Sequence, residues 1–320
     1  MCYNILNKIK GRYEMKFIDI HSHTNYSDGT STVKNSLTCA ENEGITLFSV
    51  TDHNTVGAYG EIKEKRDLFS GGILPGVELN TIYDGEVIEV LGYGIEVDKM
   101  AELIGKHYYT FREKQIREAR LDTSAVLSHG AVLDDWFIEA MYEHPETVFD
   151  PGRETNRPYL LEEMKRHPEN ARFFRSREEF ENIDRHRFSR DYLFNSKSTL
   201  YSDQSSLSPD LKTVISIIHE CGGLAFLAHA FVYSRDFIGK LPELIPYGFD
   251  GMECYYGTFT RDKKKYMSDF CDANGLYKSG GSDFHGLDFR PMNHMGLSNG
   301  ERIPFSLIEP WIDRVRSSII

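Results

Sequence analysis

Two histidines one residue apart open the stretch of this chain that is best suited to chemistry. His21 and His23 follow the apolar run of residues 17–20, which predicts a strand. Because side chains alternate along a strand, both imidazoles fall on one face and can share one ion. Asp28 follows a polar turn that Gly29 helps to close, so its carboxylate can fold back toward them. These donors suit Zn²⁺, Mn²⁺ or Fe²⁺, although an H-x-H pair also occurs as two metal-free histidines.

Further histidines and carboxylates occur where other strands are expected to end. In a parallel barrel the carboxyl ends of the strands share one face, and the active site lies there. Packing so many polar groups together is costly unless cations compensate their charges. The sequence therefore predicts a metal centre with nine candidate ligands, which are His21, His23, Asp28, His53, Glu78, Glu89, His229, Asp283 and His285.

The elements that must position these ligands alternate between strands and helices. Strand-like runs precede the candidate ligands, and helical patterns are expected at residues 32–44, 57–69, 211–221 and 261–274. Such alternation predicts parallel strands joined by helical crossovers. Between the two alternating regions the pattern becomes helical and highly charged. We therefore expect a barrel domain of residues 15–97 and 207–320, an inserted helical domain of residues 98–206, and an N-terminal extension of residues 1–14.

Composition narrows the class of protein. The chain has 320 residues, of which 40% are hydrophobic and 27% charged, as in an ordinary soluble globular protein. Its net charge of -12 argues against stable binding of duplex nucleic acid or of an anionic membrane surface. No apolar run is long enough to span a bilayer, and the amino terminus lacks the apolar core of a signal peptide. The five cysteines are scattered, so we expect a reduced, cytoplasmic protein.

Several short segments carry a resemblance to a known family. They are His21-Ser22-His23, Ser27-Asp28-Gly29, Thr51-Asp52-His53-Asn54-Thr55, Gly76-Val77-Glu78, Leu227-Ala228-His229 and Gly281-Ser282-Asp283-Phe284-His285. In this order they resemble the polymerase and histidinol phosphatase (PHP) family of metal-dependent phosphoesterases. The Ser-Asp-Gly version of the second segment is most similar to the branch of 3′,5′-nucleoside bisphosphate phosphatases and 5′-to-3′ exoribonucleases.

The resemblance implies a fold, a reaction and a ligand set. The fold would be a distorted (β/α)7 TIM-like barrel with a centre of two or three divalent ions, Mn²⁺ before Zn²⁺, Fe²⁺ or Mg²⁺. The reaction would be hydrolysis of a phosphate monoester, with hydroxide supplied by a metal-bound water rather than by a side-chain nucleophile. The catalytic residues would be His21, His23, His53, Glu78, Asp283 and His285. One ion would be held by His21, His23, Glu78 and Asp283, a second by Asp28, His53 and His285, and a third by Glu78, His229 and the residue at position 89.

Three positions need separate comment. Glu89 stands where relatives carry a histidine, so the third ion would meet a carboxylate, or Glu89 would turn away and leave a centre of two ions. Ala230 replaces a proline that commonly follows the strand-end histidine, which we expect to change only loop shape. Arg157, in Asn156-Arg157-Pro158-Tyr159, stands at a Gly-Arg-Pro-His-like motif, and its guanidinium suits a substrate phosphate. An ion pair within the insertion is the alternative for Arg157, and no general acid is evident.

Other functions fit parts of the pattern. A structural zinc site needs only four ligands, about half the number available here. A metal-dependent amidohydrolase also begins with H-x-H at a strand end, but the segments around His53 and Asp283 favour phosphoester chemistry. A histidinol-phosphate-type phosphatase has a less similar opening motif. A non-catalytic PHP module would be supported only by Glu89. We therefore expect a small phosphorylated substrate, a nucleotide or short oligonucleotide, while the oligomeric state stays open.

Overall fold

The computed structural model describes residues 16–147, 156–286 and 292–320, without the side chains of residues 111 and 156–158. The chain divides into two compact units. The first comprises residues 1–80, 88–106 and 211–320, and the second comprises residues 81–87 and 107–210. All nine expected ligands belong to the first unit.

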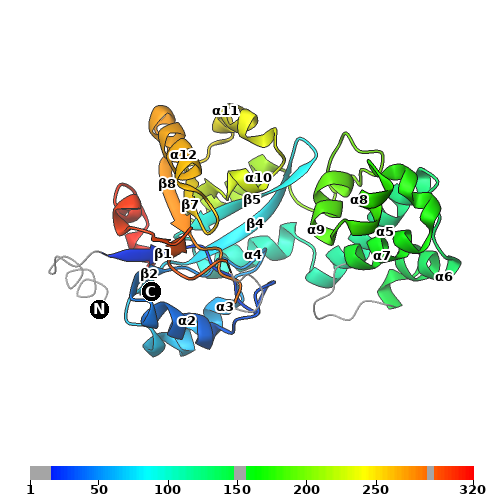
Figure 1. The fold of residues 1–320 in the computed structure, drawn as a ribbon. Coiled ribbons are helices and arrows are strands. Elements are labelled where there is room, and N and C mark those ends of the chain that lie inside the picture. Colours follow the sequence, from blue (N-terminus) through cyan, green and yellow to red (C-terminus); the bar gives the residue numbers. More distant parts are fainter. Residues whose placement is uncertain (1–15, 148–155, 287–291) are drawn as a thin grey trace. The chain divides into compact units, whose positions relative to one another are not determined.

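The strands of the first unit form two larger sheets (Figure 1). The three-stranded sheet contains β1 (Phe17–Asp19), β2 (Ile45–Phe48) and β3 (Gly72–Ile73), all parallel. The five-stranded sheet has the order β4 (Gly76–Tyr83), β5 (Glu86–Tyr93), β6 (Leu224–Leu227), β7 (Gly251–Tyr256) and β8 (Tyr277–Gly281). β6, β7 and β8 run parallel to one another, whereas β5 is antiparallel to β6. A small pair, β9 (Leu297–Ser298) and β10 (Glu301–Arg302), is antiparallel.

The expected parallel α/β class is therefore confirmed, but a closed barrel is not present among the described strands. Strands β4 and β5 meet at the turn Asp84-Gly85, where both residues have positive φ (50° and 75°), as a tight hairpin turn requires. The hairpin reverses the chain, which explains why β5 runs against β6. Two isolated parallel bridges, Ser22 with Phe284 and His53 with Glu78, join segments of the two sheets.

Helices follow the strands as the periodicity predicted. In α2 (Val33–Asn42), Thr32 caps the first turn through Asn35 N–H, and Val33 and Leu37 are buried. The helix stops before Gly44, which has a φ of 67°. The remaining helices of this unit are α3 (Ala58–Glu64), η1 (Arg66–Leu68), α4 (Val97–His107), α10 (Leu211–Glu220), η6 (Ala230–Val232), η7 (Phe237–Lys240), α11 (Leu241–Leu244), η8 (Ile245–Tyr247) and α12 (Arg261–Asn274).

The C-terminal segment completes the core under the sheets. The segment with the short helical turns η9 (Phe305–Leu307), η10 (Ile312–Arg314) and η11 (Arg316–Ser318) contributes apolar side chains, such as Trp311 and Val315, to the cluster that includes residues of β1 and β6. Trp311 stacks on Tyr93 at 5.8 Å between ring centroids and donates its indole N–H to the Lys278 carbonyl at 2.8 Å. This packing fixes the strands whose opposite ends carry the polar residues.

The second unit is helical and has its own apolar core, which includes Phe137, Leu160 and Phe188. Thr110 and Glu113 form a capping box at the start of its longest helix, α5 (Phe111–Ser128). The other elements are α6 (Asp135–Ile138), η2 (Glu139–Glu143), η3 (Pro145–Thr147), α7 (Asn156–Arg166), η4 (Pro168–Phe173), α8 (Arg177–Asn182), α9 (Arg185–Phe188) and η5 (Ser189–Leu193). Across the described ranges of the chain, no helix is long and apolar enough to cross a membrane.

Candidate metal centre

The structure brings all nine expected ligands together in the first unit. Most of them follow the carboxyl end of a strand, as expected, but Glu78 and Glu89 lie within β4 and β5 rather than after them. The nine ligands fall into four overlapping groups, in each of which one ligand atom from every member lies within 4.8 Å of the others. The groups are His23, Asp28, His53 and His285; His21, Glu78 and His229; His21, His23 and Asp283; and His53, Glu78 and Glu89. His23 thus belongs to two groups. It lies with His21 and Asp283, as expected, and also with Asp28 and His285, which were expected to hold a different ion.

Glu78 is the central ligand of the cluster. Its Oε2 lies 3.2 Å from His23 Nε2 and 3.2 Å from His53 Nδ1, and 3.4 Å from His21 Nε2. Its Oε1 lies 3.2 Å from His229 Nε2. One carboxylate therefore faces four imidazoles.

Two aspartates complete the arrangement on either side of His23. Asp283 Oδ1 lies 3.2 Å from His23 Nε2 and 3.4 Å from His21 Nε2. Asp28 Oδ1 lies 3.1 Å from His285 Nε2 and 3.6 Å from His23 Nδ1. The backbone at Asp283 has a φ of 55°, a left-handed conformation that aspartate tolerates better than most residues.

The close approach of strands β1 and β8 requires a glycine. A Cβ at Gly281 would lie 2.3 Å from the Cβ of His21. The glycine therefore allows the chain after β8 to run beside His21 and deliver Asp283 to it.

Glu89 faces the cluster. Its Oε2 lies 3.3 Å from His229 Nε2, and its Oε1 lies 3.7 Å from His53 Nδ1. Asn80 holds this orientation by donating from Nδ2 to Glu89 Oε1 at 3.1 Å, and the Glu89 backbone N–H donates to Tyr233 Oη. The carboxylate therefore points toward the other expected ligands of a third ion instead of turning away from them.

The deepest donor atoms fit cations because they lack other partners. Among the residues that the structure describes, His21 Nε2, His23 Nε2, His53 Nδ1 and Glu78 Oε2 are buried without a hydrogen bond. Buried polar atoms in proteins are almost always satisfied, so converging unsatisfied nitrogens and oxygens indicate a site for something the chain does not supply. Their chemistry, imidazole beside carboxylate, matches divalent transition metals.

The electrostatics of the cluster lead to the same conclusion. Burial lowers the pKa of His23, but the nearby carboxylates of Asp283, Glu78 and Asp28 outweigh it and raise that pKa to about 10. Burial raises the pKa of Glu78, yet the surrounding imidazoles, with His21 first, hold it well below its usual value. Without cations, the carboxylates are therefore compensated by protons on imidazoles that divalent ions would displace.

One side of the cluster is open to solvent. The side chains of His21, His23 and Glu78 are buried, whereas those of Asp28, His53 and Glu89 are 44%, 21% and 20% exposed. A substrate can therefore reach the cluster over these three residues.

Sequence reasoning missed several buried groups around the ligands. Asp52, in the Thr51-Asp52-His53 segment, accepts hydrogen bonds from the Thr24 N–H and hydroxyl at 2.7 Å and from the Ser27 hydroxyl at 2.6 Å, and so shapes the loop that carries Asp28. Asp19 accepts bonds from Ser282 and from the Gly296 N–H. Two further groups lie on β7, Glu253 in its middle and Tyr256 at its end. Asp52 could have been found from its motif, but the others lack a local signal.

Two other sequence predictions concern residues that are not candidate ligands. Arg157 lies in the first turn of α7, but its side chain is outside the described part of the chain. Ala230 is buried at the start of η6, directly after His229.

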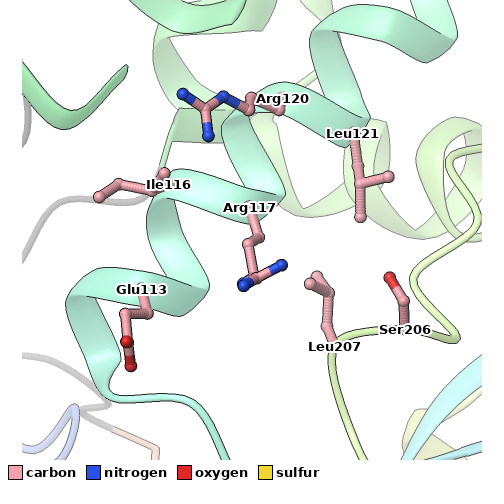
Figure 2. A pocket seen from close by; sticks show the side chains of 7 residues that line it. All are labelled: Glu113, Ile116, Arg117, Arg120, Leu121, Ser206 and Leu207. Atoms are coloured by element: carbon pink, nitrogen blue, oxygen red, sulfur yellow. The ribbon is translucent and has the colours of Figure 1, made fainter. Parts of the chain in front are cut away.

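A separate hollow lies in the helical unit, beside α5 (Figure 2). Its volume is about 340 Å³, and its lining includes Arg117, Arg120 and Leu207. The Arg117 guanidinium lies 4.1 Å from the centre of the Tyr109 ring, and Arg120 pairs with Glu146 at 2.9 Å. Because these charges already have partners, we assign the hollow no chemistry.

Comparisons with known proteins agree with this picture. No family model matches the chain. The chain is 26% identical to a 5′-3′ exoribonuclease of Haemophilus influenzae over 84% of its own length and 90% of the relative's. It is also 26% identical to a 3′,5′-nucleoside bisphosphate phosphatase of Chromobacterium violaceum, over 85% and 88%. A phosphoribosyl 1,2-cyclic phosphate 1,2-diphosphodiesterase of Eggerthella lenta is 24% identical over 87% and 97%.

Two solved structures share the fold. One is named an amidohydrolase from Chromobacterium violaceum and matches with a TM-score of 0.62 and 24% identity, over 95% of this chain and 97% of the other. The second, from Bifidobacterium adolescentis, is assigned as a metal-dependent phosphoesterase and matches with a TM-score of 0.58 and 20% identity, over 94% and 98%. The expected similarity to 3′,5′-nucleoside bisphosphate phosphatases and 5′-to-3′ exoribonucleases is thus confirmed by the sequence relatives, and the solved structures show a shared fold.

Proposed function

We propose that this protein is a metal-dependent phosphoesterase that hydrolyses a phosphate monoester of a nucleotide, of the 3′,5′-bisphosphate type, or of a short oligonucleotide. The observation that carries the proposal is the convergence of five histidines and four carboxylates whose deepest donor atoms have no hydrogen-bond partner in the described chain. The names of the relatives supply the substrate class.

We further propose that two or three divalent ions, Mn²⁺ first among them, bind at the cluster. His21, His23, Glu78 and Asp283 would hold one ion, and Asp28, His53 and His285 a second. Glu78, His229 and Glu89 would hold a third, and the carboxylate of Glu89 would favour Mn²⁺ or Mg²⁺ over Zn²⁺ at that position. When bound, such ions supply an activated water at neutral pH and stabilise negative charge on the phosphate oxygens.

The chain's own residues then have distinct tasks. The buried His21, His23 and Glu78 hold the deep side of the centre and exclude bulk water from it. Asp28, His53 and Glu89 form the open side, over which the phosphate group approaches. We also propose that Arg157 binds a substrate phosphate, a role supported by its motif and by the geometry of the guanidinium group.

The remaining proposals concern architecture and setting. The bridges from Ser22 to Phe284 and from His53 to Glu78 support a distorted (β/α)7 barrel made of both sheets. We propose this barrel for residues 15–97 and 207–320, with residues 98–206 as the inserted helical domain. A reducing, cytoplasmic setting is supported by the free thiols of Cys39, Cys221, Cys254 and Cys271.

Two alternatives have support from particular relatives. The Eggerthella lenta relative is named for a cyclic phosphodiester, which the same cations could also activate. The Chromobacterium violaceum structure is named an amidohydrolase, a class in which the same donors would serve amide hydrolysis. A histidinol-phosphate-type substrate would use the same chemistry as a nucleotide monoester.

A substrate panel separates these functions. Purified protein with Mn²⁺ would be given adenosine 3′,5′-bisphosphate, AMP, a ribose cyclic phosphate, histidinol phosphate, a 5′-phosphorylated RNA trimer, and amide and lactone substrates. We expect the highest kcat/KM for the bisphosphate or the trimer. Turnover confined to amides or lactones would overturn the proposal.

A further inference from the structure

Strand β7 supplies none of the nine candidate ligands, although it lies between β6 and β8, which lead to His229, Asp283 and His285. It carries two buried polar side chains, Glu253 and Tyr256. We propose that β7 is the positioning strand of the centre, and that Glu253 and Tyr256 orient His21, His229 and Asp283 and thereby set the affinity for divalent ions. This inference rests on the proposed function.

Glu253 holds two ligand-bearing segments with its two oxygens. Its Oε1 lies 2.8 Å from His21 Nδ1, and its Oε2 accepts a hydrogen bond from the His229 backbone N–H at 2.9 Å. When His21 donates from Nδ1, its Nε2 carries the lone pair, and that atom lies 3.4 Å from both Glu78 and Asp283. Glu253 therefore selects the tautomer and ring orientation that direct the His21 lone pair into the cluster.

Tyr256 positions another candidate ligand, Asp283. Its hydroxyl donates to Asp283 Oδ2 at 2.8 Å. The other oxygen, Oδ1, faces His23 and His21. The Tyr256 ring also packs against the His229 ring at 5.0 Å between centroids. The tyrosine thus fixes which carboxylate oxygen is directed at the cations.

A β-bulge explains how both side chains reach the cluster. In a regular strand, residues three apart point to opposite faces of the sheet. Here the register of β7 against β8 shifts between Glu253 and Tyr255. The shift adds one residue to the alternation, so that Glu253 and Tyr256 share a face. Such a local irregularity beside a cluster of ligands is typical of strands that aim functional side chains.

A purely structural role does not account for Glu253 equally well. The carboxylate has no exposed surface, and within the described residues its one ion-pair partner is His21. Burying a carboxylate is costly, and a neutral side chain would fill the same volume at lower cost. A carboxylate hydrogen-bonded to the remote nitrogen of a ligand histidine does, however, make that ligand more basic and increases metal affinity.

The test compares Glu253→Gln and Tyr256→Phe with the control Cys254→Ala. Cys254 is equally buried on the same strand, but its Sγ lies 3.6 Å from Cys271 Sγ of α12 and has no recorded contact with a ligand. Glutamine keeps the shape of Glu253 but offers one acceptor, so it cannot serve both His21 and His229. Each metal-free protein would be titrated with Mn²⁺ alone, with free Mn²⁺ followed by electron paramagnetic resonance and folding by thermal unfolding.

We expect Glu253→Gln to weaken Mn²⁺ binding by about 10- to 100-fold, as for other groups that orient metal ligands. Tyr256→Phe should weaken it less, and Cys254→Ala should keep the wild-type affinity. Excess Mn²⁺ should restore turnover in Glu253→Gln, because the ligands themselves remain. If Glu253→Gln fails to fold, Tyr256→Phe carries the test alone.

The inference would be overturned if Glu253→Gln and Tyr256→Phe both bound Mn²⁺ with wild-type affinity and differed from the wild type only in a lower unfolding temperature. An equal loss of Mn²⁺ affinity in Cys254→Ala would overturn the inference as well, because burial rather than contact with the ligands would then determine the affinity. These results are separate from a failure of the proposed function, in which the wild-type protein would bind Mn²⁺ but release no phosphate from any substrate of the panel.

Discussion

The two units of this protein differ in how they bury charged side chains. In the first unit, histidines and carboxylates are buried together, and several of their atoms lack hydrogen bonds within the described chain. In the helical unit, most charged side chains are at least partly exposed and paired, as Arg177 is with Glu181, around an apolar core, although Asp122 and Glu163 are buried. Exposed pairs contribute little to stability, whereas buried unsatisfied groups are costly. The contrast indicates that the first unit keeps its polar cluster for function.

Removing one buried ligand of the cluster, His285, should have the largest effect on activity. His285→Ala should lower phosphate release by roughly 1000-fold or more, because the ions supply several kcal/mol of transition-state stabilisation. Metal content should fall with it. The matched control is His219→Ala, since His219 is 41% exposed and pairs with Asp250 away from the cluster. Equal losses in both variants would remove the distinction between cluster and surface histidines.

Changing Glu89 tests how many ions the cluster holds. Glu89→Ala should lose one equivalent of Mn²⁺, because the carboxylate faces His229 and His53. Glu89→His should keep that equivalent but shift the preference toward Zn²⁺, a better partner for imidazole nitrogen. Both are checked by metal titration with mass-spectrometric metal analysis. If the wild type, Glu89→Ala and Glu89→His bind the same number of ions with the same metal preference, Glu89 is not a ligand.

The sequence was most informative where function and local pattern coincide. His21, His23, His53 and His229 follow apolar runs that became strands, so the local pattern located them. Glu253 could not be found in this way, because its contact with His21 joins positions 232 residues apart and its inward direction depends on a bulge. The split into two sheets was also missed, since the antiparallel pairing of β5 with β6 depends on tertiary contacts rather than on alternation.

A role of Arg157 in binding substrate phosphate would weaken the contrast between the two units, because it would give the helical unit a functional charge. Arg157→Lys should raise KM for the preferred substrate by about 10-fold, since an ammonium group cannot bind phosphate oxygens bidentately. Metal content and unfolding temperature should not change. Arg177→Lys is the control, because Arg177 is 71% exposed and pairs with Glu181. An unchanged KM for Arg157→Lys would assign this arginine to the surface pairs.

The smallest effect is expected at a surface cap of the helical unit. Asp184 accepts hydrogen bonds from the backbone N–H groups of Arg187 and His186, and the first of these contributes most to the lowered pKa of Asp184. Asp184→Ala should cost about 1 kcal/mol of stability at pH 7. Because the folded pKa is depressed, this stability is present above the ordinary value of 3.8 and is lost as the pH falls through the folded pKa.

Denaturant unfolding at several pH values checks this prediction. Asp184→Asn is the control, since asparagine caps a helix without a charge. A difference between Asp184→Ala and wild type that stays constant down to pH 2 would show that the charge of Asp184 plays no part.

Metal dependence tests the central claim most directly. The natural protein would be stripped with a chelator, its metal content measured by mass spectrometry, and phosphate release from adenosine 3′,5′-bisphosphate followed during titration with Mn²⁺. The account predicts no turnover in the stripped protein and recovery as about two or three equivalents bind. Undiminished turnover in a sample shown to be free of metal would contradict it.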